Sequence, residues 1–378
     1  RVRCGGVGCG GGIGGNGNGN GGSQGNDNAF DENKAHARRG LGRGTDDANL
    51  NHPGRETAEC RGEITGLDLK QNVLKGTLAT EIGQLTSLKF LDISKNSLGG
   101  PIPNHLYNLE NLEELLMEDN RLKSTIDDRI GNLAKLKVLS VHDNFLSGSL
   151  PRSFQNLVRM RELYLHSNEF TGEIMEYVAK MTELEEADNA NNDFAGSMPT
   201  DIGRLSKLKY FIMSNNLLSG TLPTEMGNMT AMEQFINHFN KFEGSLPTEM
   251  GNMVKMKWFK LDACYLTGTI PSDFGRMREL ELLDLSKNKL GGTLPTELGQ
   301  MESIESLQLY QNQIGGTVPT EVGQLKKLKQ LLLQQNKLGG SIREEVCDLR
   351  KRPNFLEELR ADCKREVKCP NNCCTLCS

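Results

Sequence analysis

Cysteine is the first residue type in this sequence with chemistry to offer, and it clusters near the C-terminal end. Six of the ten cysteines lie in residues 347–378: Cys347, Cys363, Cys369, Cys373, Cys374 and Cys377. Six thiols can pair in many ways, and their spacing does not choose among them. A close group of four could instead hold a tetrahedral metal ion. So dense a set is more typical of an oxidising, extracytoplasmic compartment, and we expect a cap stapled by disulfides, with no metal.

Histidines form a second candidate group, because three of the six share one place in a regular spacing. His166 is the twenty-fourth residue after His142, and His238 lies three such intervals further on. If this spacing separates strands of one parallel sheet, His142 and His166 lie on neighbouring strands about 4.8 Å apart. A metal site or a pH switch is one interpretation. Solvated histidines that contact a partner are the interpretation we favour.

Catalysis finds no support in the residue pattern. Serine, histidine and acidic residues occur, but none forms a recognised nucleophile motif, and no kinase signature is present. We therefore expect no catalytic residues, no enzyme activity and no cofactor. One Asn-x-Thr acceptor, Asn228-Met229-Thr230, predicts N-glycosylation of Asn228.

The elements that must position these groups follow from a strict repeat, which returns at every twenty-fourth residue. From Ile64 onward one slot of the repeat holds asparagine, except that Cys264 fills it once. Twelve repeats in register fit the pattern LxxLxLxxNxLxGxIPxxφGxL, in which φ is apolar. The asparagines are Asn72, Asn96, Asn120, Asn144, Asn168, Asn192, Asn216, Asn240, Asn288, Asn312 and Asn336.

This spacing predicts an α/β solenoid. Leu283 and Leu285, two positions apart, point to the same side of a short strand, and stacked turns pair such strands into a parallel sheet. No single turn closes a core, whereas twelve stacked turns do. An asparagine where the chain leaves each strand can hydrogen-bond the backbone of its own and the next turn. In segments such as Pro223-Thr224-Glu225 we expect the threonine hydroxyl to cap a short helical turn on the convex side.

The strand positions that face away from the core are free to vary, and we expect ligand recognition there. Repeats three to six are acidic at these positions: Glu114, Glu118, Asp119, Asp143, Glu162, Glu186 and Asp188. Repeats seven to nine place what should be exposed apolar and aromatic groups on adjacent strands: Tyr210, Ile212, Ile236, His238, Phe239, Trp258 and Lys260. Aromatic residues on a wet strand face are typical of binding hot spots. With Tyr164, Glu162 and Asp188, these seven form the predicted binding site.

Two polar residues occupy slots that are apolar in the other turns. Asn189 and Asn237 either weaken the core of repeats six and eight or mark a local distortion, and the sequence leaves both interpretations open.

Composition bounds the remaining questions. The net charge is −5 and basic residues are scattered, so nucleic acid is not an expected partner. No apolar run approaches the ~20 residues of a membrane span.

Residues 1–59, with 13 glycines in the first 25 positions, predict a low-complexity and disordered segment. We expect residues 60–346 to form the solenoid, residues 347–378 its cap, and an export signal or anchor to be missing from this sequence.

The motifs GTLP at 220–223 and GTIP at 268–271 resemble those of plant-type, extracellular leucine-rich repeats. The chain is similar in this respect to ectodomains of receptor-like proteins and kinases, and its cysteine-rich tail resembles that of secreted microalgal leucine-rich repeat proteins. The resemblance implies a horseshoe-shaped superhelix with a concave parallel sheet, a second sheet and short 3-10 turns on the convex side. It also implies a secreted or cell-surface location.

Together, these features predict a receptor-like module that recognises an extracellular ligand on its concave face. The inner sheet should be ~53 Å long, which suits a protein, a peptide or a polysaccharide, and the module could act within a receptor complex. One alternative is an inhibitor of secreted wall-degrading hydrolases, which resemblance to polygalacturonase inhibitors allows. Another is a structural or ice-contact protein that uses a column of Thr and Ser side chains, which occupy the fifth position after the repeated asparagine or cysteine in ten of the twelve turns.

Overall fold

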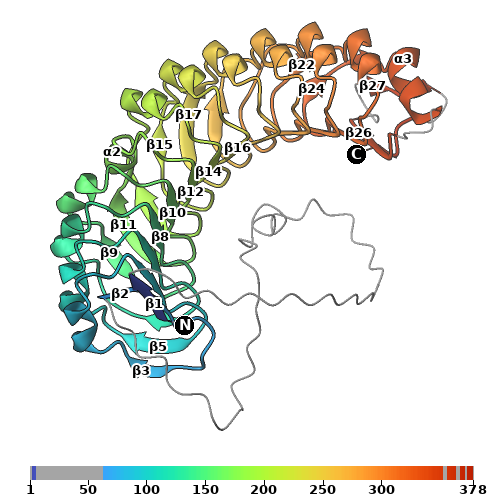
Figure 1. The fold of residues 1–378 in the computed structure, drawn as a ribbon. Coiled ribbons are helices and arrows are strands. Elements are labelled where there is room, and N and C mark those ends of the chain that lie inside the picture. Colours follow the sequence, from blue (N-terminus) through green and yellow to red (C-terminus); the bar gives the residue numbers. More distant parts are fainter. Residues whose placement is uncertain (1, 6–62, 352–355, 363–366, 371–372, 378) are drawn as a thin grey trace. The chain divides into compact units, whose positions relative to one another are not determined.

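The computed structural model describes residues 2–5, 63–351, 356–362, 367–370 and 373–377. The chain separates into two units, of which residues 1–3 and 64–378 form the first and residues 4–63 the second. Residues 64–351 form a stack of short coils that curves along its length, with strands on the inner side of the arc and short helices on the outer side (Figure 1). Most of the segment 1–59, which we predict to be disordered, lies outside the described residues.

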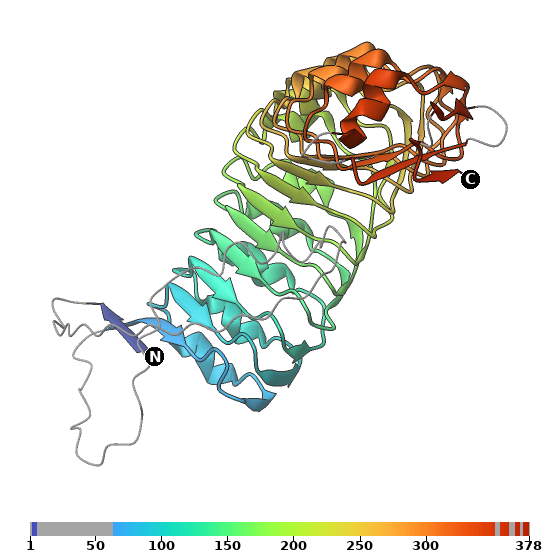
Figure 2. The ribbon, with the colours of Figure 1, turned by 90° about the vertical axis from the view of Figure 1, so that its right-hand side faces the viewer.

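The inner side is one sheet, to which each repeat contributes one strand, and the strands of successive repeats are parallel (Figure 2). Equivalent residues of successive repeats are paired, so that Phe211 lies beside Phe235 and Phe235 beside Phe259. In order, the 15 strands are β1 (Val2–Gly5), β2 (Glu63–Asp68), β4 (Phe90–Asp92), β6 (Glu114–Leu116), β8 (Val138–Ser140), β10 (Glu162–Tyr164), β12 (Glu186–Asp188), β14 (Tyr210–Ile212), β16 (Gln234–Ile236), β18 (Trp258–Lys260), β20 (Leu282–Asp284), β21 (Ser306–Gln308), β23 (Gln330–Leu332), β26 (Glu358–Ala361) and β28 (Leu376–Cys377).

Further strands pair beside this sheet, as the plant-type pattern predicts, but in short separate sheets. Three of these sheets have three strands: β3 (Lys75–Thr77), β5 (Ser97–Gly100) and β7 (Arg121–Leu122); β9 (Ser147–Ser149), β11 (Glu169–Glu173) and β13 (Asp193–Ala195); and β15 (Ser219–Gly220), β17 (Lys241–Ser245) and β19 (Tyr265–Thr267). Two have two strands: β22 (Gly315–Gly316) with β24 (Lys337–Leu338), and β25 (Gly340–Ser341) with β27 (Val367–Lys368).

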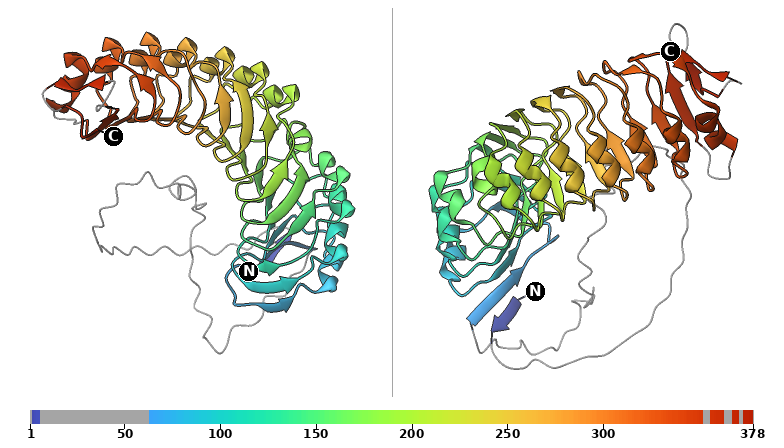
Figure 3. Two further views of the ribbon diagram at one scale, coloured as in Figure 1. Left: turned by 180° about the vertical axis from the view of Figure 1, so that it is seen from behind. Right: turned by 90° about the horizontal axis from the view of Figure 1, so that it is seen from above.

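The convex side carries one short helical turn for each repeat, and the views from behind and above show these turns in a row (Figure 3). The 3-10 turns are η1 (Thr80–Gln84), η2 (Asn104–Asn108), η3 (Asp128–Asn132), η4 (Arg152–Asn156), η5 (Thr200–Arg204), η6 (Thr224–Asn228), η7 (Thr248–Asn252), η8 (Ser272–Arg276), η9 (Thr296–Gln300), η10 (Thr320–Gln324) and η11 (Asp348–Lys351). The α-helical turns are α2 (Met175–Val178) and α3 (Glu344–Cys347). These convex turns stack so closely that most of them carry a glycine at the same position. In η6, a Cβ on Gly227 would collide with the carbonyl oxygen of Glu249 in the next turn.

The expected capping role of threonine is wrong. The residue before η6 is Pro223, which makes no side-chain cap, and the hydroxyl of Thr224 instead donates to Glu225 Oε2 at 3.2 Å. Because proline enters the turn with an extended backbone, threonine becomes the first residue of the turn itself and cannot cap it.

The repeated leucines and their substitutes fill a continuous core, as predicted. Leu283 and Leu285 are fully buried, and Phe211, Phe235 and Phe259 form a stack of neighbouring rings with centroids 6.0 and 5.4 Å apart. Burying a side chain of this size contributes roughly 1.5–3 kcal/mol to the free energy of unfolding. The core therefore passes from turn to turn without a break.

The asparagine column forms a ladder, as predicted, but its side chains bond their own and the preceding turn and not the next turn. Asn120 Nδ2 donates to the carbonyls of Ile93 in the preceding turn and Met117 in its own, at 3.0 and 3.2 Å, while Oδ1 accepts from the backbone N–H of Leu98 at 3.0 Å. Cys264, in the same slot, has no amide, and its buried thiol lies 3.9 Å from the carbonyl of Asn237. Burial raises the pKa of the Cys264 thiol to about 11, which favours an unreactive thiol.

Asn189 and Asn237 are both fully buried. The Nδ2 of Asn189 contacts the sulfur of Met213 at 3.4 Å, and that of Asn237 donates to the carbonyl of Phe211 at 3.2 Å. The Oδ1 atom of each lacks a hydrogen-bond partner. Because β12 and β16 keep the regular register around them, these residues weaken the core locally and do not distort it.

Two disulfides staple the C-terminal region, between Cys347 and Cys373 and between Cys369 and Cys374. They confirm part of the predicted cap. Cys363 and the side chain of Cys377 lie outside the described residues. None of the helices in the described ranges is both long and apolar enough to cross a membrane.

Candidate ligand-binding face

The candidate site lies on the concave face of β10 to β18, where the register aligns equivalent positions of successive repeats. Tyr210 lies beside Gln234, which lies beside Trp258, and Ile212 lies beside Ile236, which lies beside Lys260. The predicted residues of repeats seven to nine are therefore neighbours in space.

A small apolar cluster forms on this face, separate from the core. Ala190, Ile212 and Ile236 are buried together, and the half-buried Trp258 packs against them. The expectation that Ile212, Ile236 and His238 are exposed is wrong, since their exposed fractions are only 8%, 4% and 5%. The side chains point away from the core as predicted, but bulky neighbours on adjacent strands cover one another.

Three aromatic residues remain accessible beside this cluster. Tyr210 and Trp258 are half-buried, and Phe239 is 48% exposed. The indole Nε1 of Trp258 donates to Glu281 Oε2 at 3.3 Å, which fixes the orientation of the ring. Lys287 Nζ lies 5.7 Å from the centroid of the Phe239 ring, a cation–π distance. The cluster thus offers a fixed aromatic surface above an apolar base.

On the acidic strands β10 and β12, one tyrosine hydroxyl contacts two carboxylates. Tyr164 donates its hydroxyl to Glu186 Oε2 at 2.7 Å and lies 3.3 Å from Glu162 Oε2. Burial and then the neighbouring Glu186 raise the pKa of Glu162, and burial together with both carboxylates raises the pKa of Tyr164 far above its usual range. Asp188, 3% exposed, accepts from the backbone N–H of Ala190 at 3.2 Å.

Two buried carboxylates on this face were not predicted. Asp262 Oδ1 lies 3.9 Å from His238 Nδ1, and Asp284 accepts from the backbone N–H and hydroxyl of Ser286 at 3.0 and 2.7 Å. Burial, followed by the charge of Asp262, raises the pKa of Asp284 to about 6. Burial also raises the pKa of Asp262. Both residues occupy the same variable positions as the predicted acids, so their column was the signal available in the sequence.

Asn228, the predicted glycosylation acceptor, lies at the end of η6 on the convex side, where its side chain is exposed. A glycan there would leave the concave face open.

Family comparisons agree with the repeat pattern. A family described as "Leucine rich repeat" matches residues 110–170, and a second described as "Leucine Rich Repeat" matches residues 87–109, 207–229 and 279–301. A search of curated proteins found no match.

Solved structures give the longer matches. A TDR receptor is 28% identical over 81% of this chain and 52% of its own, with a TM-score of 0.73. PEPR1 with AtPEP1 is 32% identical over 76% of this chain and 44% of its own, with a TM-score of 0.67. The ectodomain of the Arabidopsis receptor kinase HAESA, in complex with an IDA peptide hormone, is 26% identical over 79% and 58%, with a TM-score of 0.66. The chain spans about half the length of these receptor chains.

Proposed function

The chain is a leucine-rich repeat protein with plant-type repeats, and from this premise we propose that its concave face binds an extracellular peptide or protein segment. The observation that carries the proposal is the apolar cluster of Ala190, Ile212, Ile236 and Trp258, which lies on the concave face apart from the core. A solenoid whose strands need only their inward residues for stability has no packing requirement for such a cluster.

The side chains around the cluster define the chemistry of the ligand. Trp258, Tyr210 and Phe239 provide the accessible contacts, and Trp258 packs against Ile212 and Ile236. The neighbouring strands carry Glu162, Glu186 and Asp188. We therefore expect a ligand with an apolar or aromatic anchor followed by basic residues, laid across several strands of the sheet.

An extracellular or cell-surface location is part of the proposal. Disulfides persist in oxidising compartments, and two join residues near the C-terminal end. The matched HAESA structure is a receptor-kinase ectodomain with a bound peptide hormone. Glycosylation of Asn228 accords with the same location.

Substitution of the accessible aromatics tests the site. Wild-type residues 1–378 and the Tyr210→Ala, Trp258→Ala double variant are immobilised and exposed to extracellular material, and retained proteins and peptides are identified by mass spectrometry. We expect a partner held by wild type to be lost, with affinity falling at least about 30-fold, because truncation of a single aromatic hot-spot residue already costs about 2 kcal/mol or more.

A control uses variable strand positions elsewhere on the concave face. Gln330 and Gln308 occupy slots equivalent to those of Trp258 and Lys260, on β23 and β21. The Gln308→Ala, Gln330→Ala variant should keep the partner. If both double variants retain it equally while circular dichroism shows folded protein, the aromatic cluster is not the binding site.

A further inference from the structure

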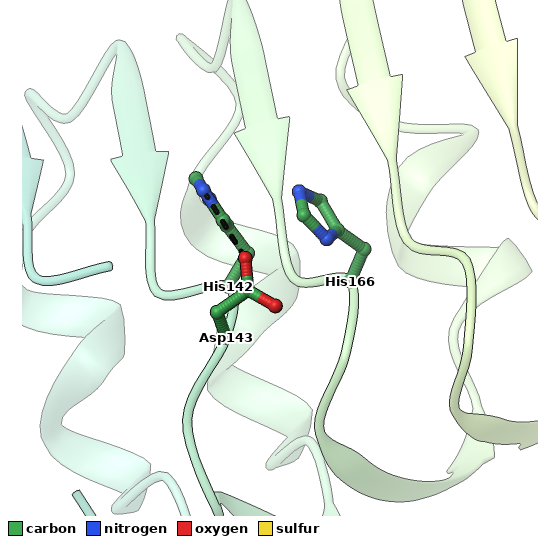
Figure 4. Close-up of side chains that lie close together, drawn as sticks. All are labelled: His142, Asp143 and His166. Atoms are coloured by element: carbon green, nitrogen blue, oxygen red, sulfur yellow. Dashed lines mark ion pairs between the residues drawn. The ribbon is translucent and has the colours of Figure 1, made fainter. Parts of the chain in front are cut away.

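A second group on the concave face has the composition of a metal site and lies outside the apolar cluster. His142, Asp143 and His166 each offer one ligand atom, and these atoms all lie within 4.8 Å of one another (Figure 4). The two imidazole rings are stacked, with centroids 4.1 Å apart. His142 and Asp143 follow β8, and His166 follows the adjacent strand β10, so the repeat itself brings them together.

We propose that His142, Asp143 and His166 bind a divalent transition-metal ion of the zinc type on the concave face. Imidazole nitrogen with a carboxylate oxygen is a ligand set that Zn²⁺ accepts. Three protein ligands leave a fourth coordination position, which is open to water or to a group of a bound ligand.

The distances suit a shared ion better than direct bonds. His142 Nε2 lies 3.9 Å from Asp143 Oδ2, which is too long for a hydrogen bond. Two atoms each bound at about 2.0–2.2 Å to one zinc ion are about 3.4 Å apart at the tetrahedral angle. Small side-chain rotations therefore complete the site.

The serine hydroxyls nearby select the nitrogen that can coordinate. His142 Nδ1 lies 2.9 Å from Ser140 Oγ, and His166 Nδ1 lies 3.3 Å from Ser167 Oγ. When Nδ1 carries the proton and donates it to the hydroxyl, Nε2 is the nitrogen that coordinates, as in other histidine metal sites.

The backbone beneath the three residues is held in place. Asn144 and Asn168 donate to the carbonyls of His142 and His166 at 3.1 and 3.3 Å, and the backbone N–H of Asp143 donates to the carbonyl of His166 at 3.1 Å. Coordination therefore requires rotation of side chains but no movement of the main chain, which lowers the cost of binding.

Titration of the full-length chain with ZnCl₂ alone, followed by calorimetry, tests the site. Because the chain contains other histidines and cysteines, the informative quantity is the difference between variants. We expect wild type to bind one more ion than the His142→Gln, His166→Gln double variant. Asp143 is exposed, so Asp143→Asn should fold normally and bind this ion at least about 10-fold more weakly.

His105→Gln is the matched control, because His105 is an exposed histidine on η2. It should bind zinc as wild type does. Substitution with Co²⁺ gives a second measurement, since the absorption lost in the double variant should lack a thiolate charge-transfer band. Equal stoichiometry and affinity in wild type and the double variant, with both folded by circular dichroism, would overturn the proposal.

Discussion

On β10 and β12 the concave side chains are polar and bind one another through the Tyr164 hydroxyl, which leaves Glu162 and Glu186 half-buried. On β14 and β16 the positions equivalent to Tyr164 and Asp188 hold Ile212 and Ile236, which are almost fully buried. The backbone and register are the same in both regions. Because Asp188 is buried as deeply as the two isoleucines, the regions differ in the polarity of the side chains that they bury and not in the depth of burial.

The largest expected effect on the free energy of unfolding comes from exchanging residues between the acidic strands and the apolar cluster. Ile236→Asp places in the apolar cluster the residue that occupies the same slot of repeat six. We expect the free energy of unfolding to fall by about 3 kcal/mol, because apolar burial is lost and a carboxylate must be desolvated. Urea unfolding measures it. The reciprocal change, Asp188→Ile, extends the apolar column beside Ile212 and should cost less than about 1 kcal/mol; equal losses would contradict the comparison.

A smaller effect concerns the buried carboxylate beside the cluster. Asp284 has a pKa of about 6 in the folded protein against an ordinary value of 3.8. Between these values the folded state holds more protons than the unfolded state, so stability falls as the pH rises from about 4 to about 7. Asp284→Asn removes this loss and should raise the free energy of unfolding at pH 7 by about 2–3 kcal/mol, with little change at pH 3.5.

Denaturant unfolding at several pH values measures the effect of Asp284→Asn. Asp193→Asn is its control, because Asp193 is an exposed aspartate on β13. An equal pH dependence in wild type and Asp284→Asn would show that burial beside the cluster does not perturb this acid.

The smallest expected effect on the free energy of unfolding comes from residues with a left-handed backbone conformation. The residue before each repeated asparagine or cysteine has positive φ. In repeats three to six it is Asp119, Asp143, Ser167 and Asn191, of which the aspartates and the asparagine are types that tolerate this conformation. In repeats seven to nine it is Asn215, Phe239 and Ala263, and the last two, with φ of 52°, lack that tolerance. We expect Ala263→Asn to raise the free energy of unfolding by about 0.5–1 kcal/mol, measured by thermal unfolding. Ala263→Val should lower it; the reverse order would refute the strain argument.

Much of the fold follows from the sequence because an uninterrupted repeat fixes which positions face the core. Leu283, Leu285 and the Asn120 ladder lie where the pattern places them. The same pattern gives the direction of Ile212 and Ile236 but not their coverage, which depends on the side chains at equivalent positions of the preceding and following repeats. The sequence did not indicate that Ala190 belongs to the cluster. Alanine is too small to suggest a binding surface by itself, and it is buried there only because it packs with Ile212 and Ile236.

The substitution of Cys264 for asparagine interrupts the ladder at one turn, immediately beside another weak point, the buried Asn237. We call the junction between these two turns the seam, because there a 3.9 Å contact of the thiol replaces the shorter bond that an asparagine amide such as that of Asn240 makes at 2.9 Å. Cooperative unfolding should divide there before it divides at any intact rung. The strands on either side of this seam, β16 and β18, carry Ile236 and Trp258. A ligand bound across both strands would therefore stabilise the junction between them. Ligand binding would then make the two parts of the solenoid unfold more cooperatively.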